Sequence, residues 1–259
     1  MPAFQIKDSV AFVTGTNKKN GIGRAIVNAL VAQGARKVYA TARKTDQLTD
    51  VVQAHPAGTI VPVALDVTDL SKIENLATDY PDVTLVVNNA GYFGAVSSLD
   101  DLQVAQTEIA VNYIAPMAIV KAFSPVLKKS NKATAVANVN SIASLINFPL
   151  GGTYSASKAA VHSLTQAQRR DLPSSLVVGV YPGPIDTDMA EKIDMEKVSP
   201  AVVADQVIEA LLSGTEDVFP DPMAQQMAEG WKADAKAMEH QMTQMATEMA
   251  QQHIQSVEA

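Results

Sequence analysis

The 259-residue sequence contains no cysteine. This absence excludes disulfide bonds, thiolate nucleophiles and zinc sites built from cysteine ligands. The histidines do not have the spacing of metal ligands, so no metal site is predicted; they are His55, His162, His240 and His253. The sequence also has no internal repeat, no low-complexity linker and no boundary that would divide it into independent domains.

Long tracts of positive charge are absent as well. The chain has 20 lysines and arginines against 27 aspartates and glutamates, which gives a formal net charge of −7. This balance argues against nucleic acid or an anionic membrane as the main partner. The first eight residues lack a basic-then-apolar signal pattern, and no apolar run approaches the length that spans a bilayer. We therefore expect a soluble, cytoplasmic protein.

Short apolar runs alternate with longer amphipathic stretches as far as about residue 220. The runs are apolar on both faces, as the strands of a parallel sheet covered by helices must be. The alternation predicts a single-domain, Rossmann-like α/β fold with a doubly wound parallel sheet over residues 1–222. The predicted strands are 10–14, 37–42, 59–65, 84–88, 134–139 and 176–181, and the first helix is 22–31.

Residues 223–259 differ from the rest, with no proline, one glycine and six of the ten methionines. Met238, Met242, Met245 and Met249 recur at helical spacing, and Met227 and Trp231 extend this stripe upstream. The pattern predicts a C-terminal helical extension that packs one apolar face on the body. A subunit contact or a lid over the active site is the alternative, because methionine adapts to irregular surfaces.

A glycine-rich loop joins the first strand to the first helix. Glycines at positions 15, 21 and 23 permit a tight turn and let the backbone approach a pyrophosphate at the helix N-terminus. The loop lies after a strand and before an amphipathic helix, and the second strand ends about 20 residues further on. This context predicts a dinucleotide site. The residues assigned to it here are Gly15, Asn17, Lys18, Gly21, Ile22 and Gly23.

The end of the second strand indicates which dinucleotide is bound. An NAD site usually has an acidic residue there that binds the ribose 2′-hydroxyl. This chain has Arg43 and Lys44 instead, and a guanidinium can hold a 2′-phosphate through two hydrogen bonds. NADP(H) is therefore favoured over NAD(H). We expect the basic groups to meet at one phosphate-binding corner; they are Lys18, Lys19, Arg24, Arg43 and Lys44.

Further motifs make the chain resemble the short-chain dehydrogenase/reductase family from residue 8 to about residue 220. Asn88-Asn89-Ala90-Gly91 follows the fourth strand, and Tyr154-Ser155-Ala156-Ser157-Lys158 has the Tyr-x-x-x-Lys pattern. Ser141 precedes Tyr154 by thirteen residues, and Pro182-Gly183-Pro184-Ile185-Asp186-Thr187 is similar to the family's Pro-Gly-x-x-x-Thr segment. The order and spacing of these motifs together are specific to the family.

The resemblance implies a set of site residues. Asn112, Ser141, Tyr154 and Lys158 match the catalytic positions. Cofactor contacts are implied, besides the loop, for Arg43, Asp66, Val67, Asn89, Ala90, Gly91, Tyr154, Lys158, Pro182, Gly183, Ile185 and Thr187. Asp66 or a neighbour is equally suited to capping a helix. The substrate pocket would include Ser141 and Tyr154 together with Tyr92, Phe93, Phe148, Pro149 and Met189.

The chemistry of these side chains agrees with the resemblance. Tyr154 and Lys158 are four residues apart, so a helix would place them on one face. An ammonium and an oxidised nicotinamide ring beside the phenol would lower its pKa, which suits a general acid in reduction and a general base in oxidation. Ser141 would stabilise developing charge on the substrate oxygen.

Asn112 has a local reason to act in the proton relay that the resemblance implies. Pro116 has no N–H, so it cannot donate to the carbonyl of Asn112 four residues earlier. This carbonyl would therefore be free at a helix kink, where family members bind a water that links the lysine to solvent.

The chain departs from the usual family pattern in its phosphate loop, because five residues separate Gly15 from Gly21 where three are usual. The wider spacing occurs in the family's enoyl-thioester reductases, but Tyr154 and Lys158 keep the ordinary interval. The sequence therefore predicts an NADP(H)-dependent enzyme that interconverts a small apolar ketone or aldehyde and an alcohol. An enoyl-thioester reductase and a non-catalytic NADP(H) sensor are the alternatives. A homodimer or homotetramer is expected.

Overall fold

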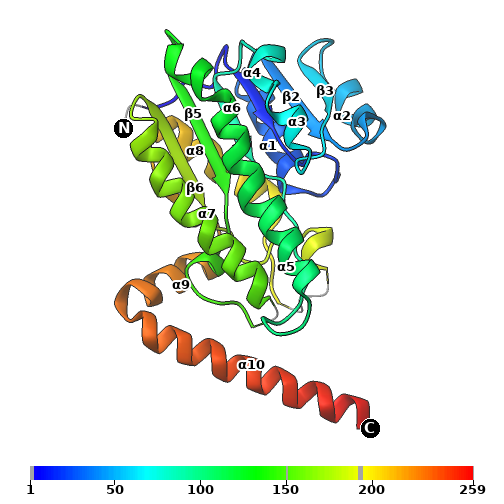
Figure 1. The fold of residues 1–259 in the computed structure, drawn as a ribbon, viewed down its shortest axis with the longest axis vertical. Helices are drawn as coiled ribbons and strands as arrows, with labels where there is room; N and C mark the ends of the chain where they lie inside the picture. The colour runs from blue at the N-terminus through cyan, green and yellow to red at the C-terminus, as the bar shows by residue number, and fades with distance from the viewer. Residues whose placement is uncertain (1–2, 150, 192–194, 259) are drawn as a thin grey trace.

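The centre of the fold is a parallel sheet whose strand order reverses at its middle (Figure 1). The computed structural model describes residues 3–149, 151–191 and 195–258, and within these ranges the sheet has seven strands in the order β3-β2-β1-β4-β5-β6-β7. The strands are β1 Val10–Val13, β2 Lys37–Ala42, β3 Ile60–Ala64, β4 Leu85–Asn88, β5 Thr134–Val139, β6 Ser175–Val180 and β7 Asp217–Val218. In such sheets ligands bind at the carboxyl ends of the strands, where the order reverses. Here that point lies between β1 and β4.

The structure confirms the doubly wound α/β fold and all six predicted strands to within one residue at each end. Pro62 lies in β3, which is one of the two edge strands of the sheet. An edge strand tolerates proline because one side of it has no ladder bonds to make. β7 was not predicted, since two residues carry no periodicity.

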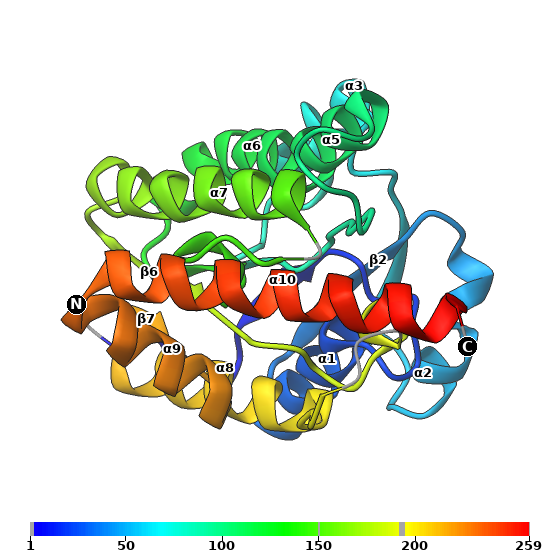
Figure 2. The ribbon, with the colours of Figure 1, turned by 90° about the horizontal axis from the view of Figure 1, so that it is seen from below.

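Helices cover both faces of the sheet (Figure 2). On one face α1 and α8 pack against each other and contribute to the larger apolar cluster. On the other face α6 supplies buried side chains to a second cluster, and α7 lies beside it. The helices are α1 Ile22–Ala32, α2 Thr49–Gln53, α3 Leu70–Ile73, α4 Leu76–Asp79, α5 Leu102–Glu108, α6 Ala115–Lys129, α7 Gly152–Asp171, α8 Pro200–Ser213, α9 Pro222–Ala233 and α10 Ala235–Glu258, with short 3₁₀ turns η1 Thr45–Leu48, η3 Ile142–Ser144 and η4 Asp188–Ala190.

The helical run from α5 to α6 contains a widened turn. Residues Ile109–Ile114 form a π-helix, η2, directly before the first turn of α6. The predicted kink at Pro116 is thus absorbed by a π-helical stretch, which proteins often use at functional sites. Asn112 lies within it.

The same run, Leu102–Lys129, is long and apolar enough to span a membrane by length and composition alone, which the sequence analysis did not foresee. Within the described residues it is the only helix of this kind. In the fold its apolar side packs on the sheet through Ile119, Val120, Phe123 and Leu127. Its hydrophobicity therefore has a structural use in the core.

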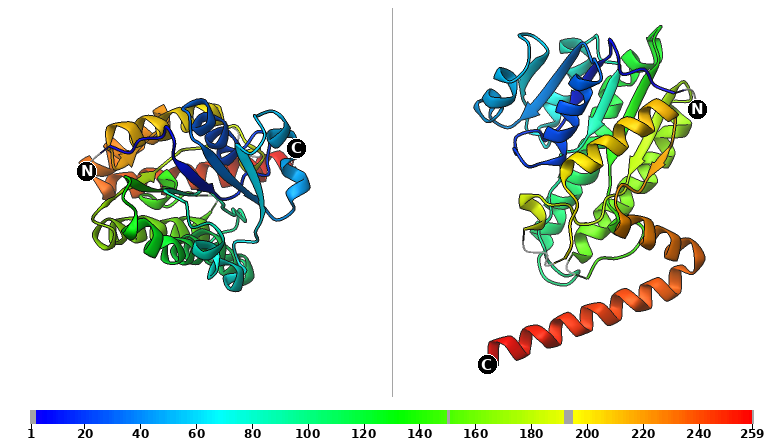
Figure 3. Two further views of the ribbon diagram at one scale, coloured as in Figure 1. Left: turned by 90° about the horizontal axis from the view of Figure 1, so that it is seen from above. Right: turned by 180° about the vertical axis from the view of Figure 1, so that it is seen from behind.

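The C-terminal extension consists of two helices, which meet at Asp234. Ala224 and Ala228 of α9 pack on Ile142, just after Ser141, so α9 supports the segment that carries that serine. α10 packs mainly on α9 and then runs across the end of the molecule at the carboxyl ends of the strands (Figures 2 and 3). Packing on the body thus describes α9 well, whereas most of α10 stands away from the sheet. The side chain of Met249, part of the predicted stripe, is outside the described residues.

We expect Phe123→Ala to lower the free energy of unfolding by about 3–5 kcal/mol, because the ring is fully buried and its loss leaves a cavity. The ring packs on Phe12 with 5.1 Å between ring centroids. The measurement is urea unfolding followed by circular dichroism. Leu99→Ala is the control, since Leu99 is 93% exposed and its truncation should change stability by less than about 0.5 kcal/mol. Equal effects of the two substitutions would contradict the assignment of Phe123 to the core.

Candidate active site

The phosphate loop lies against the turn that follows β4. Gly15 has φ +68°, and a Cβ at this position would come within 2.7 Å of the Cα of Ala90. A Cβ on Gly23 would meet the side-chain amide of Asn89 and, at 2.6 Å, the carbonyl oxygen of Gly15. Both glycines are therefore required for the close approach of loop and turn, a packing role that adds to the backbone role predicted from the sequence.

Hydrogen bonds hold the loop and the turn together. The side-chain amide of Asn89 donates to the carbonyl oxygens of Thr14 and Gly15, both at 2.9 Å. The Thr14 hydroxyl accepts from the N–H groups of Asn89 and Ala90, both at 3.0 Å. Asn89 thus shapes the site through the loop. Gly91 continues the turn towards Lys158, because a Cβ there would be 3.9 Å from Lys158 Nζ.

The N-terminus of α1 has the features of an anion site. The helix begins at Ile22, and its N-cap is Gly21. Glycine has no side chain, so no capping side chain bonds the first N–H groups of the helix. Unpaired N–H groups and the helix dipole attract phosphate. Together with the close approach at Gly15 and Gly23, this end fits a dinucleotide pyrophosphate. Asn17 lies half-buried in the same loop.

The extra residues of the loop reach across to the segment after β6. Lys18 Nζ lies 2.7 Å from a carboxylate oxygen of Asp188, and the Asn20 side-chain amide donates to the carbonyl of Asp186 at 2.8 Å. These contacts connect two loops on either side of the predicted cofactor position. Both members of the ion pair are more than half exposed, so it orients the loop more than it stabilises the fold.

The basic residues do not all meet at one phosphate corner as expected. Arg24 is buried, bonds Asp50 through two contacts of 2.9 and 3.0 Å, and donates to the carbonyls of Thr16 and Gln47. Its charge is therefore neutralised inside the protein, and Lys19 also lies 3.7 Å from Asp50. The sequence could not show this, because Asp50 is far from the loop along the chain.

Arg43 and Lys44 lie at the carboxyl end of β2 and are exposed. No hydrogen bond or ion pair to another described residue occupies either side chain, so the guanidinium is available to a ligand. At the end of β3 the carboxylate of Asp66 accepts from the Thr68 N–H at 2.9 Å and from its hydroxyl at 2.7 Å. These bonds, and more weakly the charge of Arg43, lower the pKa of Asp66. The neighbouring Asp69 is the N-cap of α3, as the capping alternative allowed. The adenine contact of Asp66 and the half-buried Val67 stays a prediction.

Ser141, Tyr154 and Lys158 come together at the carboxyl edge of the sheet. Ser141 follows β5; its hydroxyl donates to the Pro182 carbonyl at 3.4 Å and accepts from the Ala143 N–H at 3.1 Å, and its side chain acts on Tyr154 by lowering the pKa of the phenol. Lys158 is buried, and its Nζ donates to the carbonyl of Val139 at 2.9 Å. The same Nζ lies 5.7 Å from the centre of the Tyr154 ring. The helical spacing therefore places phenol and ammonium side by side, as predicted.

Burial and neighbouring groups of the protein set the pKa values of Tyr154 and Lys158. Burial raises the pKa of Tyr154 to about 12; the Ser141 side chain opposes this rise and the charge of Glu108 adds to it. Burial also lowers the pKa of Lys158 to about 8. At neutral pH the phenol is protonated and the lysine is mostly protonated, so the site is prepared to donate a proton.

Asn112 is fully engaged through its side chain. Its amide donates to the Tyr92 carbonyl and to the Ser157 hydroxyl, both at 2.9 Å, and its oxygen accepts from the Tyr92 N–H at 2.8 Å. The side chain thus connects the segment after the Asn-Asn-Ala-Gly turn to helix α7. Both hydrogens of the Asn112 side-chain amide are therefore committed within the protein.

The segment Pro182–Thr187 is held by a residue that the sequence analysis missed. Asp221 is buried, accepts from the Gly183 N–H at 2.8 Å, and caps α9 by accepting from the Ala224 N–H at 2.9 Å. The Pro182 carbonyl accepts from Ile142, next to Ser141. Ile185 is buried, and its carbonyl accepts from the Thr187 hydroxyl at 3.3 Å. An aspartate before a proline is a recognisable helix cap, but its second role needs the fold.

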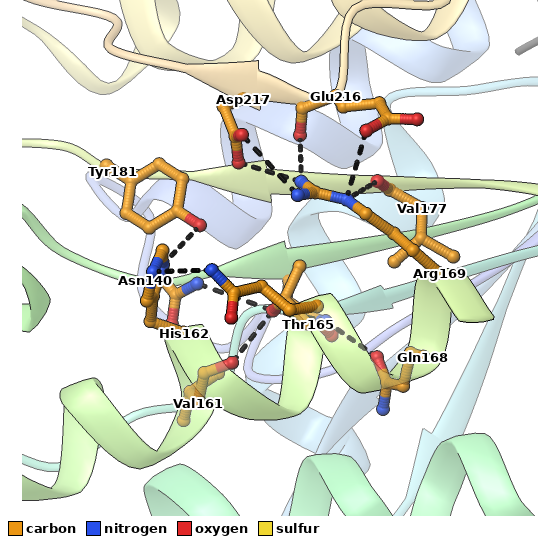
Figure 4. A network of polar contacts seen from close by, with 12 residues as sticks. Asn140, Val161, His162, Thr165, Gln168, Arg169, Val177, Tyr181, Glu216 and Asp217 are labelled. Carbon is orange, nitrogen blue, oxygen red and sulfur yellow. Dashed lines mark hydrogen bonds and ion pairs between the residues drawn. The ribbon is translucent and has the colours of Figure 1, made fainter. Parts of the chain in front are cut away.

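A polar network fixes α7, the helix that carries Tyr154 and Lys158 (Figure 4). Asn138 of β5 donates to Thr165 at 3.0 Å and to Gln168 at 2.8 Å. Further along α7, Arg169 pairs with Asp217 of β7 at 2.7 Å. The helix is therefore tied to the sheet at several points, which fixes its rotation and hence the position of the face that carries Tyr154 and Lys158.

His162 and Tyr181 add a contact in the same network. A ring nitrogen of His162, Nδ1, lies 2.9 Å from the Tyr181 hydroxyl, and the two rings meet edge to face (Figure 4). Tyr181 is buried and stacks on Phe219 with centroids 5.2 Å apart. The histidine thus has a packing and hydrogen-bonding partner in the interior.

The predicted substrate residues surround Tyr154 unequally. The Phe93 ring meets the Tyr154 ring edge-on, with 5.0 Å between centroids. A Cβ on Gly151 would come within 2.6 Å of the Phe93 ring, so this glycine, not singled out from the sequence, allows the contact. Phe148 is tied back through its N–H to the Ser155 hydroxyl at 2.8 Å. The other predicted pocket residues have no described contact with Tyr154: Tyr92, Pro149 and Met189.

Comparison with known proteins agrees with this geometry. A sequence family described as short chain dehydrogenase matches residues 9–198. An uncharacterized oxidoreductase of Staphylococcus epidermidis is 31% identical over 218 residues, which is 80% of this chain and 92% of that protein.

Solved structures show the same likeness. A short chain dehydrogenase from Burkholderia cenocepacia in complex with NADP is 37% identical, with a TM-score of 0.85, and the match covers 92% of this chain and 99% of that one. A short chain dehydrogenase/reductase from Burkholderia phymatum in complex with NAD is 24% identical, with a TM-score of 0.79 over 90% of this chain and 96% of that one. At this identity the second structure supports the fold alone.

The buried ammonium gives a prediction about stability. We expect Lys158→Met to raise the free energy of unfolding at pH 7 by roughly 1–3 kcal/mol, because a hydrophobic side chain replaces a desolvated charge. In the wild type, the unfolded chain binds more protons at this lysine than the folded chain between pH 8 and 10.5. The free energy of unfolding of the wild type therefore rises with pH through that window. The difference in this free energy between Lys158→Met and the wild type becomes smaller.

Urea unfolding at pH 7 and pH 10 measures this difference. Lys121→Met, at an exposed lysine of α6, is the control and should change stability little at either pH. A destabilised Lys158→Met protein at pH 7 would show that the ammonium contributes more through its bond to Val139 than it loses by burial.

Proposed function

The chain is an oxidoreductase of the short-chain dehydrogenase/reductase family, and on this premise we propose that it interconverts a ketone or aldehyde and an alcohol with NADP(H). The observation that carries the proposal is the cluster of Ser141, Tyr154 and buried Lys158 beside the phosphate loop. An acid, a cation and a hydroxyl at one point suit proton transfer to a carbonyl oxygen.

Each residue has a separate part in the proposed reaction. Bound NADPH would supply the hydride. The protonated Tyr154 donates its proton to the substrate oxygen, and the Ser141 hydroxyl hydrogen-bonds the same oxygen as negative charge develops. Lys158 holds a positive charge beside the phenol, which favours the phenolate that remains after the proton has left.

Asn112 completes the proposed relay through its backbone. Its side chain is committed to Tyr92 and Ser157, and Pro116 cannot bond its carbonyl in an α-helical pattern. The main-chain carbonyl is thus the group through which Asn112 would bind a water connecting Lys158 to solvent.

The preference for NADP(H) over NAD(H) is also proposed. It is supported by the exposed guanidinium of Arg43 at the end of β2, where no carboxylate stands to bind a ribose hydroxyl. The related Burkholderia cenocepacia structure contains NADP, which agrees with this assignment.

The alternatives remain distinct in their expected behaviour. An enoyl-thioester reductase would act on a conjugated double bond, and a non-catalytic sensor would bind NADPH without consuming it. The ordinary Tyr-Lys interval favours carbonyl reduction over the first, and the intact catalytic cluster favours an enzyme over the second. We further propose a small apolar substrate, a cytoplasmic location and a homodimer or homotetramer.

We expect Tyr154→Phe to lower the carbonyl-dependent oxidation of NADPH at least about 10²-fold, because proton transfer by a positioned side chain contributes about 10²–10⁴-fold. The measurement is loss of NADPH absorbance with a panel of ketones and aldehydes, run beside an enoyl thioester. Tyr113→Phe, on η2, is the matched control. Full activity of Tyr154→Phe on an accepted carbonyl would contradict the assigned role, and turnover of the thioester alone would favour the alternative.

We expect Arg43→Asp to raise the KM for NADPH at least about tenfold and to leave the KM for NADH within about twofold, since a carboxylate repels the 2′-phosphate and can accept from a ribose hydroxyl. Steady-state kinetics with both cofactors measures the change. Arg170→Asp, on the far end of α7, serves as control for the altered net charge. An unchanged preference in Arg43→Asp would show that this residue does not select the cofactor.

A further inference from the structure

Glu108, the last residue of α5, is a fully buried acidic side chain to which the proposed reaction gives no part. Its exposed fraction is 0%. One carboxylate oxygen accepts from the Gly94 N–H at 2.9 Å, and the other has no hydrogen-bond partner among the described residues. A buried carboxyl group with a single bond is costly, so its position calls for a reason beyond packing.

The bond to Gly94 is one of two polar anchors on the segment Tyr92–Gly94. Asn112 holds Tyr92 through both its N–H and its carbonyl. Glu108 lies four residues before Asn112 on the same helical run, and it holds Gly94. Successive turns of one helix therefore fix both ends of a three-residue segment.

Phe93 stands between the two anchors, and its ring faces Tyr154. The edge-on contact of 5.0 Å places the phenylalanine against the side of the proposed proton donor. Gly94 and Gly151 leave room for this arrangement, because a Cβ on Gly94 would collide with Val104 of α5 and a Cβ on Gly151 with the Phe93 ring. The position of the Tyr154 ring is thus connected through Phe93 to Glu108.

We propose that Glu108 is a positioning residue that, by holding Gly94, keeps Phe93 against Tyr154 and so fixes the proton donor of the reaction proposed above. This inference rests on the proposed function, because Glu108 affects catalysis only if Tyr154 donates the proton. The contact between Phe93 and Tyr154 is independent of it.

The charges around Tyr154 support this role. Burial is the main cause of the raised pKa of Tyr154. The Ser141 side chain lowers this pKa, and the negative charge of Glu108 raises it. Lys158, on α7, is the cation facing the ring. Glu108 therefore also favours the protonated phenol, the form that donates in reduction.

Two variants separate the bond from the charge. Glu108→Ala removes both, whereas Glu108→Gln keeps a carbonyl oxygen that can accept from the Gly94 N–H. We expect Glu108→Ala to lower kcat for carbonyl reduction at least about tenfold with the KM for NADPH within about twofold. Glu108→Gln should recover kcat at pH 7 to within about threefold of wild type, and the alkaline limb of its pH profile should move to lower pH, because the phenol then loses its proton more easily.

The control is Gln106→Ala, at an exposed position of the same helix, which should leave kcat, KM and pH profile as in the wild type. A merely structural role would lower the melting temperature of the alanine variant without moving the pH profile of the glutamine variant. Wild-type kcat in Glu108→Ala together with a wild-type pH profile in Glu108→Gln would overturn the proposal.

A second measurement does not need a substrate. Tetranitromethane nitrates tyrosine as the phenolate, so peptide mass spectrometry of the treated protein reports the exposure and ionisation of Tyr154. We expect nitration of Tyr154 to be several-fold faster in both Glu108 variants than in the wild type and in Gln106→Ala, with Tyr80, which packs on Phe12, as internal reference.

Unchanged nitration of Tyr154 in both Glu108 variants would overturn the proposal. If the alanine variant failed to fold, unchanged nitration in the glutamine variant alone would overturn it. If none of the tested carbonyl compounds caused the wild type to oxidise NADPH, the proposed function would fail. The nitration rates would still decide whether Glu108 controls Tyr154.

Discussion

The burial of the Lys158 ammonium is the constraint on which the rest of the site depends. An ammonium in the interior is unfavourable unless polar groups surround it, and here the carbonyl of Val139 at the end of β5 accepts one of its bonds. This contact requires α7 to lie at a fixed height along the sheet. The bonds from Asn138 to Thr165 and Gln168, and from Arg169 to Asp217, hold the helix at that height.

The fixed helix organises its surroundings in turn. Ser157, on the face of α7 next to Lys158, receives the side chain of Asn112, which also holds Tyr92. Tyr154 meets Phe93 edge-on, and the Ser141 side chain lowers its pKa. The proposed catalytic residues thus come from three separate segments, and each is placed by hydrogen bonds to its neighbour and by packing around one helix. Such support is what keeps a reactive side chain in one geometry.

The sequence predicted the local features of this site well. Strand lengths followed from continuous apolar runs, and the Tyr154–Lys158 interval placed both side chains on one face of α7 because helical spacing is a local property. Gly15 and Gly23 were recognised for their backbone role. The sequence did not predict the pairing of Arg24 with Asp50, the capping of α9 by an aspartate that also holds Gly183, or the burial of Glu108, because each depends on residues that are distant along the chain.

The pKa that the protein's own groups give Tyr154 depends on the fold for a related reason. Proximity to a lysine can be inferred from spacing, but the degree of burial cannot, and burial is the larger effect at this phenol. The sequence by itself determined the doubly wound fold and selected the candidate phosphate loop and the candidate acid, cation and hydroxyl, since these follow from periodicity and short-range motifs. Only the tertiary structure decided the charge state of the site, which basic residues are free to meet a phosphate, and where α10 lies, because desolvation and ion pairing are set by groups that the fold brings together.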